Sequence, residues 1–284
     1  DLFRPDVVLY TPLGGALGTR LNPPKELVRE IAGRMPMFTI IWDAKPACGI
    51  ETWWLPYVTY IGMPDCLSAF DYYKNMGSVI PMYSAVDPGS YYNKNMERDI
   101  DVSFVGSVDP TDRRWPMRNE CITYLKEKGV KIFVGGGQRS AGRLSVEGLC
   151  DILNRSKISL NFCRDGNGLA ILKSRVFEVT SCGALIMEDR GTDTQRLFDE
   201  GKDFIVFQDK EELLGLVRYY LEHEEKRRAV ADAGWAKAFY VYNARNMWGH
   251  IFEAMGFELP RELADNPAYH AHNEAMERLL ALPL

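Results

Sequence analysis

The chain has 284 residues, of which 46% are hydrophobic and 26% charged, and its formal net charge is −5. This composition excludes disordered and fibrous proteins, and the net negative charge argues against a broad nucleic-acid or anionic-membrane surface. No apolar run approaches the roughly 20 residues of a membrane span, and the first residues lack the apolar core of a signal peptide. We therefore expect a cytoplasmic protein without a membrane span, long enough for two lobes.

Strands alternate with helices in the first part of the chain. Strands are predicted at 6–10, 37–42, 57–62 and 79–82, and helices at 24–33 and near 65–76. Such alternation is typical of a parallel sheet covered on both faces, which binds ligands beyond the carboxyl ends of its strands. We assign residues 1–98 to an N-terminal Rossmann-like lobe. The polar stretch 84–98 has no periodicity and is predicted to be a hinge.

The alternation resumes in a second set of elements. Strands are predicted at 101–106, 131–135, 158–162, 185–187 and 204–207, and helices at 116–128, 146–155, 174–182, 194–200, 210–223 and 226–240. The fold class is therefore α/β with two Rossmann-like lobes, the second over residues 99–255. Residues 256–284 are assigned to a C-terminal tail or helix, and we expect no element to fix His270 and His272 within it.

The segment from Leu172 to Asp189 carries the strongest functional signal. Ser174 suits the N-cap of a short helix and Gly183 its C-terminal end, and the apolar residues that follow predict a buried parallel strand. Arg175 and Glu178 lie three residues apart and so share one helix face, beside the N-terminus that attracts anions. The pattern favours a nucleotide diphosphate, with an internal salt bridge between the two residues as the alternative.

This segment also carries a family resemblance. Its pattern K-x-R-x-F-E-x-x-x-C-G-A, preceded by residues 155–162 and followed by 197–203, resembles the spore-maturation-type (CgeB-like) glycosyltransferases, relatives of the family 4 enzymes of GT-B fold. The likeness extends from about residue 101 to 255. Family 4 enzymes usually have a second glutamate eight positions before the one that matches Glu178, and Ala170 occupies that place here.

The resemblance implies a two-lobed enzyme that takes a sugar from a nucleotide-diphosphate sugar donor and passes it to an acceptor. Glu178 is implied to hold the ribose hydroxyls. Arg175, Lys173 and the helix N-terminus at Ser174 then neutralise the diphosphate, so no metal ion and no cofactor are expected. The first lobe would hold the acceptor, which is a saccharide, a protein or a small molecule.

Two glycine-containing strand ends are further candidates for nucleotide binding. Gly136, Gly137 and Gln138 follow a predicted strand, where they either approach the base or form an ordinary turn. Gly106 also ends a strand, and the cations after it, Arg113 among them, either contact the diphosphate or are simply solvated.

Catalysis in the first lobe is assigned to Asp43, at the carboxyl end of a predicted strand, with Asp65 as the weaker alternative. The histidine of retaining family 4 enzymes is missing from this lobe. Only about 95 residues precede the second lobe, so we expect a short first sheet of about four strands, either truncated in this chain or reduced.

Other patterns in the sequence point away from metal and redox chemistry. Asp99 and Asp101 form an Asp-x-Asp pattern that leads into a strand instead of ending one, which favours a solvated hinge over a manganese site. The six cysteines lack metal-ligand spacing and are expected to be buried free thiols. Two functions remain as alternatives to a transferase: a catalytically silent binding or structural relative, and a nucleotide-sugar epimerase or hydrolase.

Overall fold

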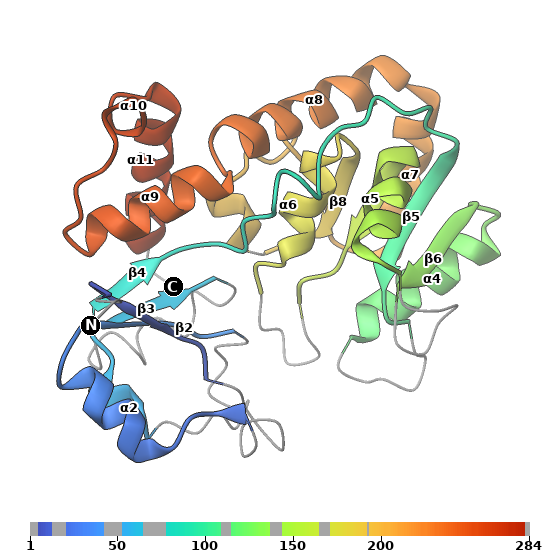
Figure 1. Ribbon diagram of the computed structural model, residues 1–284. Coiled ribbons are helices and arrows are strands. Elements are labelled where there is room, and N and C mark those ends of the chain that lie inside the picture. Colours follow the sequence, from blue (N-terminus) through green and yellow to red (C-terminus); the bar gives the residue numbers. More distant parts are fainter. Residues whose placement is uncertain are drawn as a thin grey trace.

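The computed structural model describes residues 5–12, 21–42, 53–64, 78–108, 115–136, 144–164, 171–191 and 193–281. Within them the chain forms two parallel sheets, each with helices against it (Figure 1). No helix of the described residues is long and apolar enough to cross a membrane. Of the predicted site residues, Asp43, Arg113, Gly137 and Gln138 lie outside the described residues, as do Asp65 and Ala170.

The first sheet has four parallel strands in the order β1-β2-β3-β4. Its elements are β1 (Val8–Tyr10), α2 (Lys25–Ala32), β2 (Met37–Ile40), the 3-10 turn η1 (Leu55–Tyr57), β3 (Tyr60–Met63) and β4 (Ser78–Pro81). All four residues of β2 are buried, which explains why its sequence is nearly all apolar. Counted over the described residues, the sheet has the four strands expected from the sequence.

The second sheet has five parallel strands in the order β6-β5-β7-β8-β9. The strands are β5 (Ile100–Gly106), β6 (Ile132–Gly136), β7 (Ser156–Asn161), β8 (Leu185–Asp189) and β9 (Ile205–Phe207). The helices are α4 (Pro116–Glu127), α5 (Val146–Arg155), α6 (Ser174–Ser181), α7 (Lys210–Glu222) and α8 (Glu224–Tyr240). The chain places β6 on one side of β5 and β7 on the other, so the topological switch point lies between β5 and β7.

Two local predictions for this lobe need correction. The helix expected at 194–200 is only a 3-10 turn, η3 (Asp193–Arg196). The N-cap of α6 is Lys173, and Ser174 is the first helical residue. At the other end Cys182 is the C-cap, and Gly183 follows it with φ +72°. The Gly183 N–H donates to Thr180 O, and the Ala184 N–H donates to Val179 O. These are the hydrogen bonds of a Schellman motif. Gly183 therefore ends the helix as predicted, one position beyond the C-cap.

The C-terminal residues are helical, the second of the two options given for residues 256–284, and they return to the first sheet. The expectation that no element fixes His270 and His272 is therefore wrong, because both lie in a helix. They form α9 (Ala244–Ala254), α10 (Arg261–Ala264) and α11 (Pro267–Ala281), and Figure 1 shows these helices beside β4. Met276 of α11 packs in the same core cluster as Ile80 of β4 and Phe177 of α6. His272, which no element was expected to fix, is fully buried.

The stretch predicted as a hinge has no regular element up to residue 99, and its second half is attached to the second lobe. The buried Asn154 accepts a hydrogen bond from Lys94 N at 2.7 Å and donates one to Tyr92 O at 3.0 Å. Arg98 donates to Ser156 O at 2.6 Å and to Cys182 O at 2.9 Å. Residues 92–98 are therefore held against α5 and the C-terminal end of α6.

Candidate nucleotide site at the carboxyl edge of the second sheet

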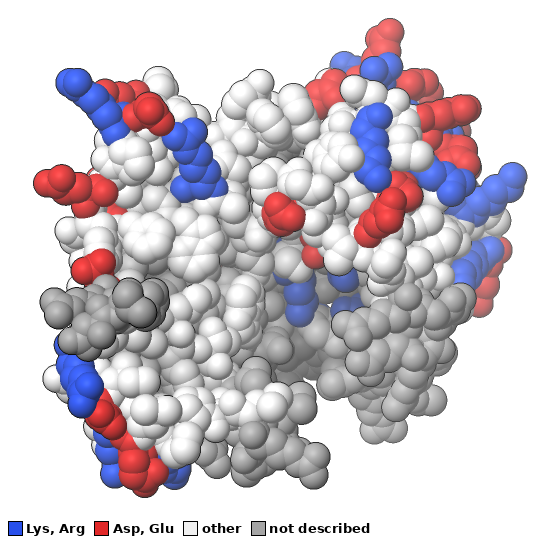
Figure 2. Space-filling view, in the orientation of Figure 1, with Lys and Arg blue, Asp and Glu red and all other residues white. Residues whose placement is uncertain are grey.

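Three strands of the second sheet end beside α6. β5 ends at Gly106, β6 at Gly136 and β7 at Asn161, and Gly106 lies opposite Gly136 in the sheet register. Because all strands are parallel, these ends share the carboxyl edge, where the switch point between β5 and β7 opens a crevice for a ligand. Figure 2 shows Lys and Arg atoms recessed in a hollow between the two parts of the molecule.

The two glycines keep this edge free of side chains. A Cβ on Gly106 would lie 2.9 Å from Cζ of Phe104 and 3.5 Å from Nη2 of Arg175. Gly136 has φ +81°, and a Cβ there would lie 2.7 Å from Cγ1 of Val105. Glycine is therefore required at both strand ends, and the backbone stays open to a ligand.

Arg175 reaches this edge from the first turn of α6. Its Nη1 donates to Oδ1 of Asn161 at 3.4 Å, and its guanidinium lies 5.4 Å from the Phe104 ring centre. Its buried Nε has no hydrogen-bond partner among the described residues. A buried N–H without a partner is costly, so this atom favours an acceptor arriving from the ligand.

Asn161 and Glu188 support Arg175 and were missed by the sequence reasoning. Nδ2 of Asn161 donates to Oε2 of Glu188 at 2.7 Å, and both residues are fully buried at the ends of β7 and β8. The Glu188 carboxylate thus holds the amide nitrogen of Asn161, and the amide oxygen of Asn161 faces Arg175. The available signal was a polar residue at the carboxyl end of each apolar strand.

Lys173 and Arg118 bring two further cations to the same edge. Lys173 Nζ lies 4.6 Å from the Trp115 ring centre, and Arg118 Cζ lies 4.4 Å from it. Nη1 of Arg118 also donates to Ser107 O at 3.1 Å, just beyond the end of β5. The N-caps of α4 and α6 are Trp115 and Lys173, and neither side chain makes a capping hydrogen bond. Two helix N-termini with their positive dipole ends therefore meet at this edge.

Glu178 lies one turn further along α6 and is half-buried. Among the described residues no ion pair joins it to Arg175, so the internal salt bridge considered from the sequence is not formed. Tyr91 lies near it: burial, and next the negative charge of Glu178, raise the pKa of Tyr91 to about 12. The carboxylate therefore remains available for a neutral donor such as a hydroxyl.

The structure brings together most of the described site residues. Lys173, Ser174, Arg175, Gly106 and Gly136 meet at the carboxyl edge of β5, β6 and β7, and Glu178 lies one helical turn from them. Asp99 and Asp101 lie elsewhere and form ion pairs with Arg155 at 2.5 Å and Lys157 at 2.6 Å. Within the described part of the chain, no group of three His, Cys, Asp or Glu side chains could hold a metal ion. Four of the predicted thiols are confirmed as buried and free, namely Cys121, Cys150, Cys163 and Cys182.

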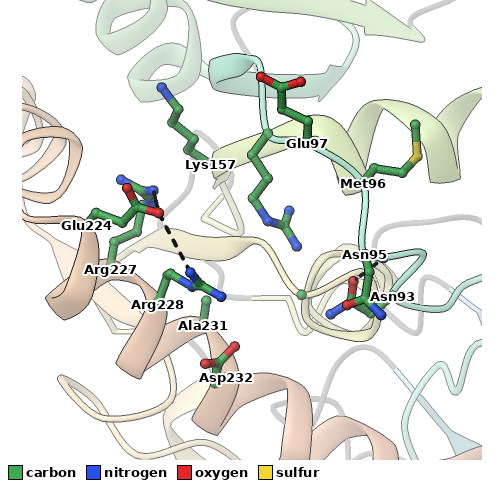
Figure 3. Close-up of a pocket in the computed structure, with 12 residues that line it drawn as sticks. Asn93, Asn95, Met96, Glu97, Lys157, Glu224, Arg227, Arg228, Ala231 and Asp232 are labelled. Atoms are coloured by element: carbon green, nitrogen blue, oxygen red, sulfur yellow. Dashed lines mark hydrogen bonds and ion pairs between the residues drawn. The ribbon is translucent and has the colours of Figure 1, made fainter.

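A cavity of about 530 Å³, lined by both basic and acidic side chains, lies at the opposite end of α6, between residues 93–98 and α8 (Figure 3). The cations that line this cavity already have partners within the protein. Arg98 holds backbone carbonyls at the ends of α5 and α6, and Arg227 donates to Tyr220 O at 3.0 Å. Arg228 faces Glu224, and Lys157 pairs with Asp101. These pairings make the carboxyl edge the better candidate site, in spite of the volume of this cavity.

Comparison with known proteins identifies the family. The model of the family described as glycosyl transferase-like matches residues 93–253, more than half of the chain. No curated protein sequence matches this chain. HepE of Anabaena, solved in complex with UDP-glucose, has a TM-score of 0.63 at 11% identity, over 88% of this chain and 78% of that chain. Sucrose-phosphate synthase of Thermosynechococcus elongatus has a TM-score of 0.54 at 10% identity, over 80% and 70%.

The TarM structure also resembles this chain, with a TM-score of 0.58 at 6% identity, over 88% of this chain and 55% of TarM. At such low identities these structures show the fold alone. Together with the two parallel sheets, they show the GT-B arrangement expected from the sequence. The matched segment begins at residue 93 and covers α6 and the carboxyl ends of β5, β6 and β7. The chain therefore belongs to the glycosyl transferase-like family and is a glycosyltransferase of GT-B fold.

Proposed function

We propose that the protein transfers a sugar from a nucleotide-diphosphate sugar to an acceptor, without a metal ion, and that it is of the CgeB-like kind. The observation that carries the proposal is Arg175, which stands at the switch point of the second sheet with an unpartnered Nε. Because HepE was solved with UDP-glucose and with UDP, UDP-sugars are the first donors to test.

The site provides fixed positive charge where a leaving diphosphate would develop negative charge. Arg175 and Lys173 come from the first turn and N-cap of α6, whose free N–H groups point the same way. When the bond between the sugar and the diphosphate breaks, the electron pair moves to the leaving phosphate oxygen, and these cations and the helix dipole stabilise it. Such preorganised charge takes the place of a metal ion.

Glu178 is assigned to the ribose of the donor. It lies on the same helix, one turn from Arg175, and has no ion pair among the described residues. A carboxylate that accepts from both ribose hydroxyls holds the nucleoside while the arginine holds the phosphates. The first lobe would bind the acceptor, with Asp43 as its general base.

A catalytically silent binding protein is the second candidate, because Ala170 replaces the second glutamate of family 4 enzymes. A donor-cleavage assay separates the two. The protein is incubated with UDP-glucose, UDP-galactose and UDP-N-acetylglucosamine, and UDP release is measured with and without simple sugar acceptors. Slow UDP release supports the transferase, UDP binding without release supports the silent protein, and an isomerised donor supports an epimerase. Absence of any nucleotide binding contradicts the proposed site.

A further inference from the structure

Trp115 joins two cations that come from different helices. Its ring centre lies 4.6 Å from Nζ of Lys173, the N-cap of α6, and 4.4 Å from Cζ of Arg118, in the first turn of α4. Trp115 is itself the N-cap of α4. One indole therefore connects the two helix N-termini that face the carboxyl edge of the sheet.

A second ring continues the arrangement toward Arg175. The Phe104 ring centre lies 5.3 Å from Cζ of Arg118 and 5.4 Å from Cζ of Arg175. Three cations and two rings thus alternate in the order Lys173, Trp115, Arg118, Phe104 and Arg175. Phe104 is fully buried in the sheet core, whereas Trp115 is only partly buried at the edge.

An aromatic ring holds a cation in a way that a carboxylate does not. The negative face of the ring attracts the cation but carries no net charge, so the positive charge is not cancelled. Like charges held close together repel each other, and a contact with the ring offsets part of that repulsion. The ring contact therefore positions the cations without itself weakening their attraction for an anionic ligand.

We propose that Trp115 is a positioning residue of the donor site, which holds Lys173 and Arg118 side by side so that they meet the diphosphate together. The inference rests on the proposed function of this edge. It assigns to Trp115 no contact with the nucleoside. Loss of the ring should therefore weaken binding of the phosphates and leave binding of the base and ribose unchanged.

The test compares UDP and uridine binding by calorimetry in the full chain. Trp115→Leu should lose about tenfold in UDP affinity, since two cation–π contacts are removed, and less than twofold in uridine affinity. Trp115→Phe keeps a smaller ring and should lose about threefold for UDP only. The control is Trp235→Leu on α8, whose partly buried ring stacks on Phe239 at 5.2 Å, and it should bind both ligands as the unmodified protein does.

A double-mutant cycle separates positioning from a general loss of structure. Lys173→Ala should weaken UDP binding in the unmodified protein and have a smaller effect in Trp115→Leu, because the leucine variant no longer holds the ammonium in place. Equal effects of Lys173→Ala in both backgrounds, or equal losses for UDP and uridine, would overturn the inference. If Trp115→Leu does not fold, the same comparison in Trp115→Phe decides. UDP binding absent from the unmodified protein would refute the proposed function and this inference with it.

Discussion

Replacement of Arg175 by alanine tests the proposed nucleotide site most directly. The guanidinium has one long hydrogen bond, 3.4 Å to Asn161, and a buried Nε without a partner among the described residues. A diphosphate would give it charge-assisted, bidentate hydrogen bonds of about 1.5–3 kcal/mol, so Arg175→Ala should weaken UDP binding about 10- to 150-fold. Uridine lacks phosphates, and its affinity should change less than twofold.

The stability cost of this substitution should be small. The variant loses a contact with the Phe104 ring, of about 0.5–1 kcal/mol, and a hydrogen bond too long to contribute much. We therefore expect the melting temperature to fall by only a few degrees, since about 1 kcal/mol corresponds to roughly 2–4 °C in a domain of this size. Arg175→Lys keeps the charge without the planar fork and should recover part of the affinity.

Arg228→Ala is the matched control. Arg228 lines the cavity beside α8, its side chain is 70% exposed, and its ion pair with Glu224 is loose at 3.9 Å. Both variants, measured by calorimetry with UDP and with uridine, should distinguish the carboxyl edge from the cavity beside α8. If Arg228→Ala loses UDP affinity and Arg175→Ala does not, the nucleotide binds in the cavity beside α8 and the reasoning from the switch point is wrong. Equal loss of uridine binding in Arg175→Ala would indicate damage to α6 instead.

Three other outcomes are expected. Glu178→Ala should weaken UDP and uridine binding alike, by at least about tenfold, because both ligands carry the ribose. The variant should remain folded. Unchanged affinity in calorimetry would remove Glu178 from the site. Activity should survive excess EDTA, and full loss with rescue by manganese would contradict a metal-free mechanism. Burial lowers the pKa of His272 from 6.5 to about 3. As the pH falls, the unfolded chain therefore takes up this proton before the folded chain does. The contribution of His272 to stability, present above pH 6.5, should fall by about 2 kcal/mol on going to pH 5, in thermal or denaturant unfolding. Burial also lowers the pKa of His250, so His272→Asn should remove the share of His272 and leave that of His250.

Local patterns in the sequence determined the order of the elements and the position of the motif helix. The apolar residues 184–187 and the glycine before them predicted β8 and the end of α6, because a buried parallel strand and a left-handed helix end each leave a signal within a few residues. The same logic placed Arg175 and Glu178 on one helix. The predicted N-cap, Ser174, is wrong by one residue, because the N-cap is Lys173. Backbone angles define the N-cap, and the type of side chain only makes a position more favourable for it.

Only the tertiary structure decided what surrounds Arg175. Asn161 and Phe104 reach it because β5 lies next to β7, and Trp115 reaches Lys173 because two helix N-termini meet at one edge. Strand order depends on packing between residues far apart in the chain, and no local pattern encodes it. The burial of His272 has the same cause: no element was expected to fix it from the sequence, and it is buried because α11 packs against α9 and β4.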